Sequence, residues 1–434
     1  MISLIIRIYK EGVPLRKSLI VLATCCLLFL LVTPTLADVN FNINGKAYQP
    51  TIQPRIEEGS TMVPVYLVGR ILGAEINTSD ENINIIKNGQ TFTLTLDSAK
   101  ASLNGETVNL PLAPRRENGE VMVPLRAIMD AFKVRVDWQG QTKTVVINYQ
   151  EQRQGLNVDE MLVKSSEALA QYNTYKTKAD MKQQIEVNNP KEPGKKEKID
   201  MKMDMDMAVQ NKPVLVYGKT RAQVALPEGA GDIGMEAMDS EMLLNEQGMY
   251  ITMPGQGWVK MTIPGMDIKA LMEQAGSQDP ISSLKQLKEA GVIMSFGDDQ
   301  QKNGHAYWVI NATMGADSVS RLIQNVLKQV PLPQADNAEI NKVLAQLFKN
   351  MKADIVYCVW INQENFLTDY MQLDSNIRIN MQIPPEVTEQ EETVTMDMAM
   401  KQNAFYEIYD LGVPFTVPDV SEAVDMNQIL QQNN

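Results

Sequence analysis

A repeat of sixty residues in the first third of the chain is the sequence feature that most restricts its fold. Four motifs return at this one offset: Ile43-Asn44-Gly45 as Leu103-Asn104-Gly105, Pro54-Arg55 as Pro114-Arg115, Gly59 as Gly119, and Met62-Val63-Pro64-Val65 as Met122-Val123-Pro124-Leu125. A constant offset across four motifs indicates two tandem copies of one supersecondary unit. The region must therefore be built from two similar halves.

Each copy carries the signals of hairpins followed by a helix. Asn-Gly between alternating apolar residues predicts a two-residue hairpin, because both residues tolerate a positive φ. The proline of Met-Val-Pro cannot donate a ladder hydrogen bond, so it marks a strand end just before the helix. Apolar residues at helical spacing follow: Val65, Val68 and Leu72, then Leu125, Ile128, Met129 and Phe132. Alternating strands close each copy, and we expect small antiparallel sheets curled over short helices.

These motifs resemble a known domain. The Asn-Gly hairpin, the segment Met122-Val123-Pro124-Leu125-Arg126 and the closing Val136-Asp137-Trp138 and Thr144-Val145-Val146-Ile147 resemble the copper amine oxidase N-terminal domain, or stalk domain, of exported bacterial proteins. The resemblance covers residues 38–150 and implies a non-catalytic spacer, adhesion or dimerisation module. Arg115, Arg116 and Arg126 could form a basic patch for a cell-wall or envelope partner, with an ordinary solvated face as the alternative. Copper amine oxidases hold their copper on three histidines. This chain has one, His305, so the oxidase reaction is excluded.

The first 37 residues have the layout of a secretory signal peptide. Arg16 and Lys17 precede an apolar run over residues 18–32, and Thr35-Leu36-Ala37 places small side chains before a cut ahead of Asp38. The run is about 15 residues long, shorter than the ~20 that a membrane-spanning helix needs. We expect a cleaved leader, with a retained N-terminal anchor as the alternative. The protein is therefore expected to be exported, either extracellular or at the cell surface or envelope.

The composition excludes several classes of function. Removing the leader takes four of the 40 basic and one of the 53 acidic side chains, which changes the net charge from -13 to -16. That acidity disfavours nucleic acid as a partner. Of the three cysteines only Cys358 remains, so no intrachain disulfide can form. One histidine cannot build a multi-histidine metal site, and the sequence has no Gly-rich phosphate loop, Gly-x-Ser-x-Gly elbow or Cys-x-x-Cys pair, so we predict no catalytic residue, no metal and no cofactor.

A polar linker at residues 151–157 leads into a second domain at residues 158–430. Asn157 is placed to cap an opening helix. About eleven alternating segments follow, more than a flat sheet holds comfortably, so the sheet is expected to curl. Helical patterns interrupt the strands at residues 267–276, 281–290, 318–330 and 338–351. The predicted class is α+β: a tandem-repeat antiparallel sheet with short helices, then a curled antiparallel half-barrel sheet with covering helices.

Methionine is concentrated in this second domain, because the first 154 residues hold only four of the 27 methionines. Methionine alternates with charged residues over residues 199–207 and recurs at every second position over residues 394–400. Side chains alternate faces along a strand, so each stripe shares one face. Three interpretations follow: methionine fills an irregular core, it lines a cavity for a flexible apolar ligand, or, as a minor alternative, its thioethers bind Cu(I).

A second resemblance favours the cavity. Met249-Tyr250-Ile251-Thr252, Gly257-Trp258-Val259-Lys260, Gly304-His305-Ala306-Tyr307-Trp308 and Val413-Pro414-Phe415-Thr416-Val417-Pro418, taken in order, resemble the LolA-like lipoprotein-carrier fold of exported bacterial proteins. The resemblance implies an incomplete barrel, lidded by helices, around an apolar cavity for acyl chains. The candidate ligand-binding residues are Met201, Met203, Met205, Met207, Met249, Ile251, Met253, Trp258, Trp308, Met396, Met398 and Met400.

The sequence thus predicts a non-enzymatic exported protein of the cell envelope. Its C-terminal domain is expected to bind a hydrophobic small molecule or lipid, and its N-terminal domain to act as a spacer or adhesion module. The alternative is a structural or protein-interaction protein of the surface whose C-terminal domain has no ligand cavity.

Overall fold

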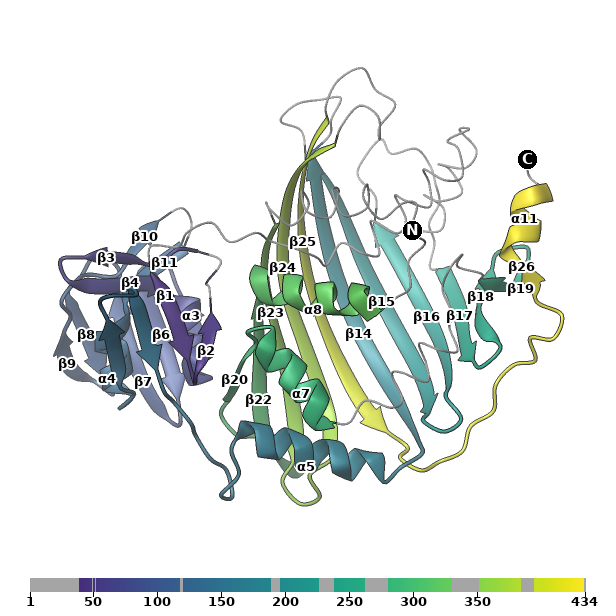
Figure 1. The fold of residues 1–434 in the computed structure, drawn as a ribbon, viewed down its shortest axis with the longest axis horizontal. Helices are drawn as coiled ribbons and strands as arrows, with labels where there is room; N and C mark the ends of the chain where they lie inside the picture. Colours follow the sequence, from purple (N-terminus) through teal and green to yellow (C-terminus); the bar gives the residue numbers. More distant parts are fainter. Residues whose placement is uncertain are drawn as a thin grey trace.

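The structure is a computed structural model that describes residues 39–48, 50, 52–117, 120–188, 196–225, 238–261, 280–329, 351–383 and 394–432. The expected signal peptide, the expected helix at residues 267–276 and all but the last residue of the expected helix at residues 338–351 lie outside this part of the chain; that last residue, Met351, begins a strand instead. Among the described residues, no helix is both long enough and apolar enough to cross a membrane. The described chain forms three small sheets, one large sheet and several short helices (Figure 1).

The N-terminal region, residues 39–150, contains the three small sheets and two helices. The strand orders are β12-β13-β1-β2, β10-β11-β4-β3 and β5-β6-β7-β8-β9. The elements are β1 (Asn40–Ile43), β2 (Lys46–Tyr48), β3 (Arg55–Glu57), β4 (Ser60–Pro64), α3 (Val65–Leu72), β5 (Glu75–Thr78), β6 (Asn82–Lys87), β7 (Gln90–Thr95), β8 (Lys100–Leu103), β9 (Glu106–Asn109), β10 (Arg115–Glu117), β11 (Glu120–Pro124), α4 (Leu125–Ala131), β12 (Val136–Gln139) and β13 (Thr144–Ile147).

The two repeats interlock rather than forming separate units. Strand β4 of the first copy pairs with β11 of the second, and β1 pairs with β13 in parallel. The predicted Asn-Gly hairpins are confirmed, because Asn44, Gly45, Asn104 and Gly105 all have positive φ. Both predicted helices form directly after Met-Val-Pro. Sharing strands lets two short units bury one common core, which neither could build alone.

The C-terminal region is one thirteen-stranded sheet with helices on one side. Its order is β20-β22-β23-β24-β25-β14-β15-β16-β17-β18-β19-β26, and β21 pairs with β22. The elements are α5 (Val158–Ala170), β14 (Thr174–Asn188), β15 (Lys196–Gln210), β16 (Leu215–Ala225), β17 (Met238–Asn245), β18 (Gly248–Met253), β19 (Gly257–Met261), α7 (Pro280–Glu289), β20 (Ile293–Phe296), β21 (Gln300–Lys302), β22 (His305–Gly315), α8 (Ala316–Gln329), β23 (Met351–Asn362), β24 (Thr368–Ile383), β25 (Val394–Tyr409), β26 (Val424–Asp425) and α11 (Met426–Gln432).

The predicted α+β class is confirmed: the large sheet curls into an open half-barrel, and α5, α7 and α8 lie across its β20–β25 part (Figure 1). Helix α5 begins at the predicted cap, since Asn157 Oδ1 accepts from the backbone N–H of Glu160 and the Glu160 carboxylate accepts from that of Asn157. Met161 of α5 packs against Phe296, Trp308, Ile310 and Ile361. These contacts hold the helix against the sheet.

The two regions meet where α3 packs against β20. Gly73 ends α3 in the left-handed conformation, with φ 66°, and a Cβ added there would lie 1.8 Å from the carbonyl oxygen of Phe296. The Ser295 hydroxyl donates to the carbonyl of Arg70 at 2.8 Å. Ile293 of β20 belongs to the hydrophobic core of the N-terminal region. Backbone contact this close is possible only because residue 73 has no side chain.

A buried lysine completes the junction. Lys87 is only 2% exposed, and its Nζ donates to the carbonyl of Phe296 at 2.5 Å. The ammonium lies 3.1 Å from a carboxylate oxygen of Glu151 and 3.8 Å from one of Asp298. Burial lowers the pKa of Lys87, while Glu151 opposes the shift. A buried charge requires partners of this kind, so the network joins β6, the linker and β20 into one unit.

We expect Gly73→Ala to destabilise the protein more than Gly89→Ala. Both glycines have positive φ, so both variants share a backbone penalty of about 1 kcal/mol. Only residue 73 faces a backbone oxygen, whereas nothing lies within 4 Å of a Cβ at residue 89. The added overpacking should cost about 1–3 kcal/mol in the free energy of unfolding. Urea denaturation measures this, and equal midpoints for the two variants would contradict the close junction.

We also expect Lys87→Met to lower the free energy of unfolding by about 3 kcal/mol. The substitution removes the donor to Phe296 and one of the cations beside Glu151. Lys100→Met is the matched control, because Lys100 is exposed on β8 and should change stability by less than about 0.5 kcal/mol. Thermal unfolding of the two variants side by side tests the expectation. A Lys87 variant as stable as the control would show that the buried ammonium does not hold the regions together.

Candidate functional site

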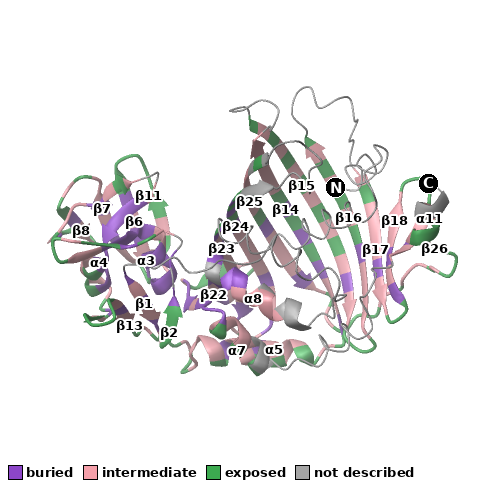
Figure 2. Cartoon of the chain, turned by 45° about the horizontal axis from the view of Figure 1, so that its top comes forward, coloured by how far each residue is buried: buried purple, intermediate pink, exposed green. Residues whose placement is uncertain are grey.

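The candidate site is one face of the central strands of the large sheet. On β15, Met201, Met203, Met205 and Met207 are half-buried, while the intervening Lys202, Asp204 and Asp206 are exposed. The predicted separation of methionine from charge is therefore confirmed for this strand. Figure 2 shows it as alternating intermediate and exposed bands along β14, β15 and β16.

Strand register carries this face across the sheet. Directly paired residues point to the same side, and the chain of pairs Met205, Ala179, Tyr406, Met371, Val359, Ile310 and Phe296 runs from β15 to β20. Phe296 and Ile310 contact α5, so the methionines share the side on which the helices lie. We call the β25, β14 and β15 part of this side the methionine face. Its described side chains are Tyr175, Thr177, Ala179, Met181, Gln183, Ile185, Val187, Glu197, Ile199, Met201, Met203, Met205, Met207, Val209, Met398, Met400, Gln402, Ala404, Tyr406 and Ile408.

Burial changes along the methionine face. Thr177, Ala179, Met181, Ala404 and Ile408 are at most 9% exposed. Toward the other end of the strands, the apolar side chains are only half-buried: Ile185, Val187, Ile199, Met201, Met398 and Met400. Among the described elements, β15 makes its main contacts with its neighbours β14 and β16. In the described part of the chain, the far end of the face is thus a partly open apolar surface.

Several predicted ligand-binding residues extend this face. Met207 pairs with Gly218, Gly218 with Met242 and Met242 with Ile251. Ile251 therefore points to the same side, as do Met249 and Met253 two positions away on β18, and all three are half-buried. Met398 and Met400 join the face directly. Met396 of β25 pairs with Met381 of β24. The side chain of Met396 is not among those that the structure describes.

Two predicted residues do not belong to the open face. Trp258 pairs with Thr252, whose neighbour Ile251 points to the methionine side, so Trp258 faces the opposite side. Trp308 lies on the correct side but is 3% exposed, packed against Phe366 with ring centroids 5.2 Å apart. It belongs to the core beneath α5. The strand register therefore places Trp258 on the opposite face, and packing beneath the helix buries Trp308.

Sequence analysis missed two glutamines on the methionine face. Gln183 of β14 and Gln402 of β25 are direct cross-strand partners, and both are half-buried. The Gln183 amide donates to the sulfur of Met400 at 2.8 Å, and the Gln402 amide donates to the sulfur of Met181 at 3.2 Å. Each glutamine lies two residues after a methionine on its own strand. Extending the period-two pattern to polar residues would have found them.

The opposite face is charged and aromatic. Lys202 lies 3.5 Å from Asp204 and 3.9 Å from Asp180, an exposed arrangement that contributes solubility more than stability. The ammonium of Lys302 lies 3.9 Å from the centre of the Phe405 ring and 4.2 Å from that of Tyr370. Burial raises the pKa of the Cys358 thiol to about 11, so little reactive thiolate forms at neutral pH. The opposite face therefore carries a cation–aromatic cluster around Lys302 and a largely protonated thiol at Cys358.

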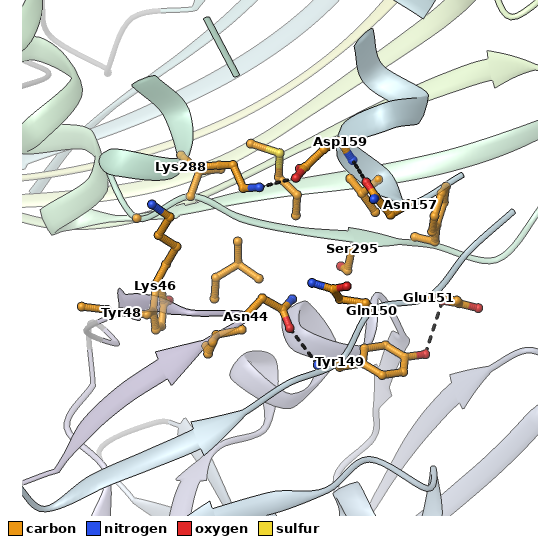
Figure 3. Close-up of a pocket in the computed structure, with 18 residues that line it drawn as sticks. Asn44, Lys46, Tyr48, Tyr149, Gln150, Glu151, Asn157, Asp159, Lys288 and Ser295 are labelled. Carbon is orange, nitrogen blue, oxygen red and sulfur yellow. Dashed lines mark hydrogen bonds and ion pairs between the residues drawn. The ribbon is translucent and has the colours of Figure 1, made fainter. Parts of the chain in front are cut away.

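A small cavity lies at the junction of the two regions (Figure 3). It measures about 100 Å³ and lies between β1–β2, the start of α5, α7 and β20. Lys288 and Asp159 form an ion pair at one wall, and Asn44 accepts from the backbone N–H of Tyr149 at another. Ligand pockets are usually about 300–1,000 Å³, so this cavity is too small for a typical organic ligand and has room only for a few water molecules.

The described titratable side chains do not form a clear catalytic or metal-binding cluster. His305 is exposed on β22, with Nδ1 3.7 Å from a carboxylate oxygen of Glu364. The described residues contain no group of three or more His, Cys, Asp or Glu side chains placed to hold a metal ion. The arrangement that distinguishes the molecule is therefore the methionine face and not a polar centre.

Comparison with known proteins assigns both regions. The copper amine oxidase N-terminal domain family matches residues 42–147, which confirms the resemblance of the N-terminal region. No curated protein matches the chain. Similar solved structures include LprF from Mycobacterium bovis (13% identity, 60% of this chain and 95% of that one, TM-score 0.29) and the lipoprotein LppX from Mycobacterium tuberculosis (11% identity, 60% and 97%, TM-score 0.27).

A third similar structure is a putative outer membrane lipoprotein-sorting protein domain from Vibrio parahaemolyticus, with 10% identity over 62% of this chain and 97% of that one and a TM-score of 0.15. The Vibrio domain is described as a lipoprotein-sorting protein, the class that the second resemblance named. Their TM-scores are low, so the role of the C-terminal region is inferred from its own residues. A family of unknown function, DUF6612, matches residues 157–422. Because this match spans more than half of the chain, the protein belongs to the DUF6612 family.

Proposed function

We propose that this is a non-enzymatic, exported protein of the cell envelope that binds a flexible hydrophobic ligand, such as a lipid acyl chain, on the methionine face. The observation that carries the proposal is the half-exposed apolar surface around Ile185, Ile199, Met201 and Met400. Soluble proteins rarely expose contiguous apolar surface without a use for it. A ligand chain laid on this surface would remove it from water.

The residue types suit a flexible and variable ligand. Methionine is unbranched and polarizable, so a row of methionines can adapt to chains of different length and shape. Each buried CH₂ group of a ligand contributes roughly 0.8 kcal/mol, so a chain of a dozen such groups gains substantial affinity even on an incomplete surface. Sheets usually prefer Val, Ile and aromatic residues, so methionine at every second position of β15 fits an adaptable surface better than a packed sheet.

The available side chains support a binding role over catalysis. The only histidine is exposed beside Glu364, and burial raises the pKa of the one described cysteine. Binding of Cu(I) by thioethers is less well supported, because the sulfur atoms of Met400 and Met181 already accept hydrogen bonds from glutamine amides. We infer a passive carrier or receptor.

The N-terminal region would act as a spacer that presents the sheet to an envelope partner. The buried Lys87 network and the contact at Gly73 favour a fixed orientation between the regions over a flexible tether. Export by a cleaved leader is also a proposal, because it rests on the sequence of residues 1–37, which lie outside the described part of the chain.

We expect Met203→Lys to weaken lipid binding by about tenfold or more, which corresponds to ~1.4 kcal/mol. A charge on the apolar face must be desolvated when an acyl chain covers it. Gln223→Lys is the matched control, because Gln223 is exposed opposite Lys202 on the other face and the substitution adds the same single positive charge. Native mass spectrometry of protein incubated with phosphatidylglycerol vesicles measures the bound lipid.

The same experiment separates a carrier from a structural protein. A carrier shows adducts in the lipid mass range for the wild type and for Gln223→Lys, with fewer for Met203→Lys. If the wild type carries no lipid under any loading condition, the proposal fails and the face serves only for packing. Equal loading of all three proteins would move the binding site away from the methionine face.

A further inference from the structure

A band of polar side chains crosses the methionine face between two apolar areas. Ser375 of β24 pairs with Gln402 of β25, Gln402 pairs with Gln183 of β14, and Gln183 pairs with Met201 of β15. The pairs two positions away on either side are apolar at Ile185 and Met400 and at Met181 and Ala404. Hydrogen-bonding groups therefore lie between two areas of apolar side chains, away from Thr177 and Glu197 near the two ends of the face.

The glutamines are incompletely satisfied by the described residues. Their only described hydrogen bonds are those to the sulfur atoms of Met400 and Met181. A thioether is a weak acceptor, and each amide has two N–H donors and a carbonyl oxygen. Both side chains are half-buried, so they lose part of their hydration without gaining a strong partner in the described part of the chain. Within the described residues, each amide therefore has a second N–H that these bonds leave unused.

A surface for a pure hydrocarbon would not retain such groups. Polar groups covered by an apolar chain without a hydrogen bond cost free energy, and leucine or methionine at residues 183 and 402 would avoid that cost. Glutamine donors become favourable when the ligand itself brings strong acceptors to the same place. An ester carbonyl supplies an acceptor and no donor, which matches two amides that each have an N–H free.

We propose that Gln183 and Gln402 bind the ester carbonyl groups of an acylated lipid, whose chains lie on the apolar residues beside the band. This inference rests on the proposed lipid-binding function and specifies the ligand's chemistry. The ligand class is a lipid with ester-linked acyl chains, not an isoprenoid or an alkane. The amide donors set the depth at which the chains begin, and the methionines accommodate their length.

Two lipids that differ only at the linkage test the proposal. Phosphatidylglycerol with ester-linked chains and its ether-linked analogue have the same headgroup and the same chain length, but only the ester has carbonyl acceptors. We expect the wild-type full chain to bind the ester form roughly tenfold more tightly, as two net hydrogen bonds would give. Competition between the two lipids in native mass spectrometry measures the ratio directly.

Substitution of the glutamines should remove the preference. In Gln183→Leu/Gln402→Leu we expect the ester-to-ether ratio to fall close to one while the ether lipid still binds, which also shows that the variant is folded. Gln184→Leu is the matched control: Gln184 is the neighbouring residue on the opposite face, where its amide donates to Asp200 at 2.9 Å. It should keep the wild-type ratio.

The outcomes distinguish this inference from the proposed function. A wild-type protein that binds both lipids equally overturns the inference and leaves lipid binding intact. A double variant that loses both lipids to the same extent also overturns it, because the glutamines would then serve only to pack the face. If neither lipid binds to any of the proteins, the proposed function itself has failed.

Discussion

The continuous register of the long strands is the constraint on which the C-terminal region depends. Strands β14 and β15 remain paired from Thr174 opposite Gln210 to Asn188 opposite Lys196 without interruption. A slip of one residue would bring Asp204 and Lys202 to the helix side and expose the methionines. The unbroken ladder therefore separates apolar from charged side chains across the middle of the sheet and creates a mainly apolar face that the two glutamines cross.

The second constraint is the contact between the regions at the carbonyl of Phe296. Lys87 donates to that oxygen, Gly73 leaves room for it, and the adjacent Ser295 bonds to α3. These contacts involve the backbone and a buried charge, which tolerate little displacement. The edge strand β20 is thereby covered by the N-terminal region, which protects it from pairing with other chains. The two regions are thus joined at a point that tolerates little displacement.

Much of the fold could be predicted from local patterns. The Asn-Gly turns, the helices after Met-Val-Pro and the cap at Asn157 depend on a few neighbouring residues, and all formed as expected. The alternation at Met203 and Asp204 predicted which side chains share a face. Trp258 and Trp308 were misplaced because their environments depend on register through Thr252 and on the packing of α5. The Gln183–Gln402 pair was missed because it joins strands that are more than two hundred residues apart.

The sequence by itself determined the repeat, the α+β class and the separation of methionine from charge, because these follow from turn chemistry and from the period of two along a strand. Only the tertiary structure decided how the two repeats interlock, which end of the methionine face is buried and where Lys87 is buried. Those features depend on strand order and on contacts between distant segments. No local pattern specifies which strand becomes the neighbour of another, so the partners of Gln183, Gly73 and Lys87 emerge only when the chain is folded.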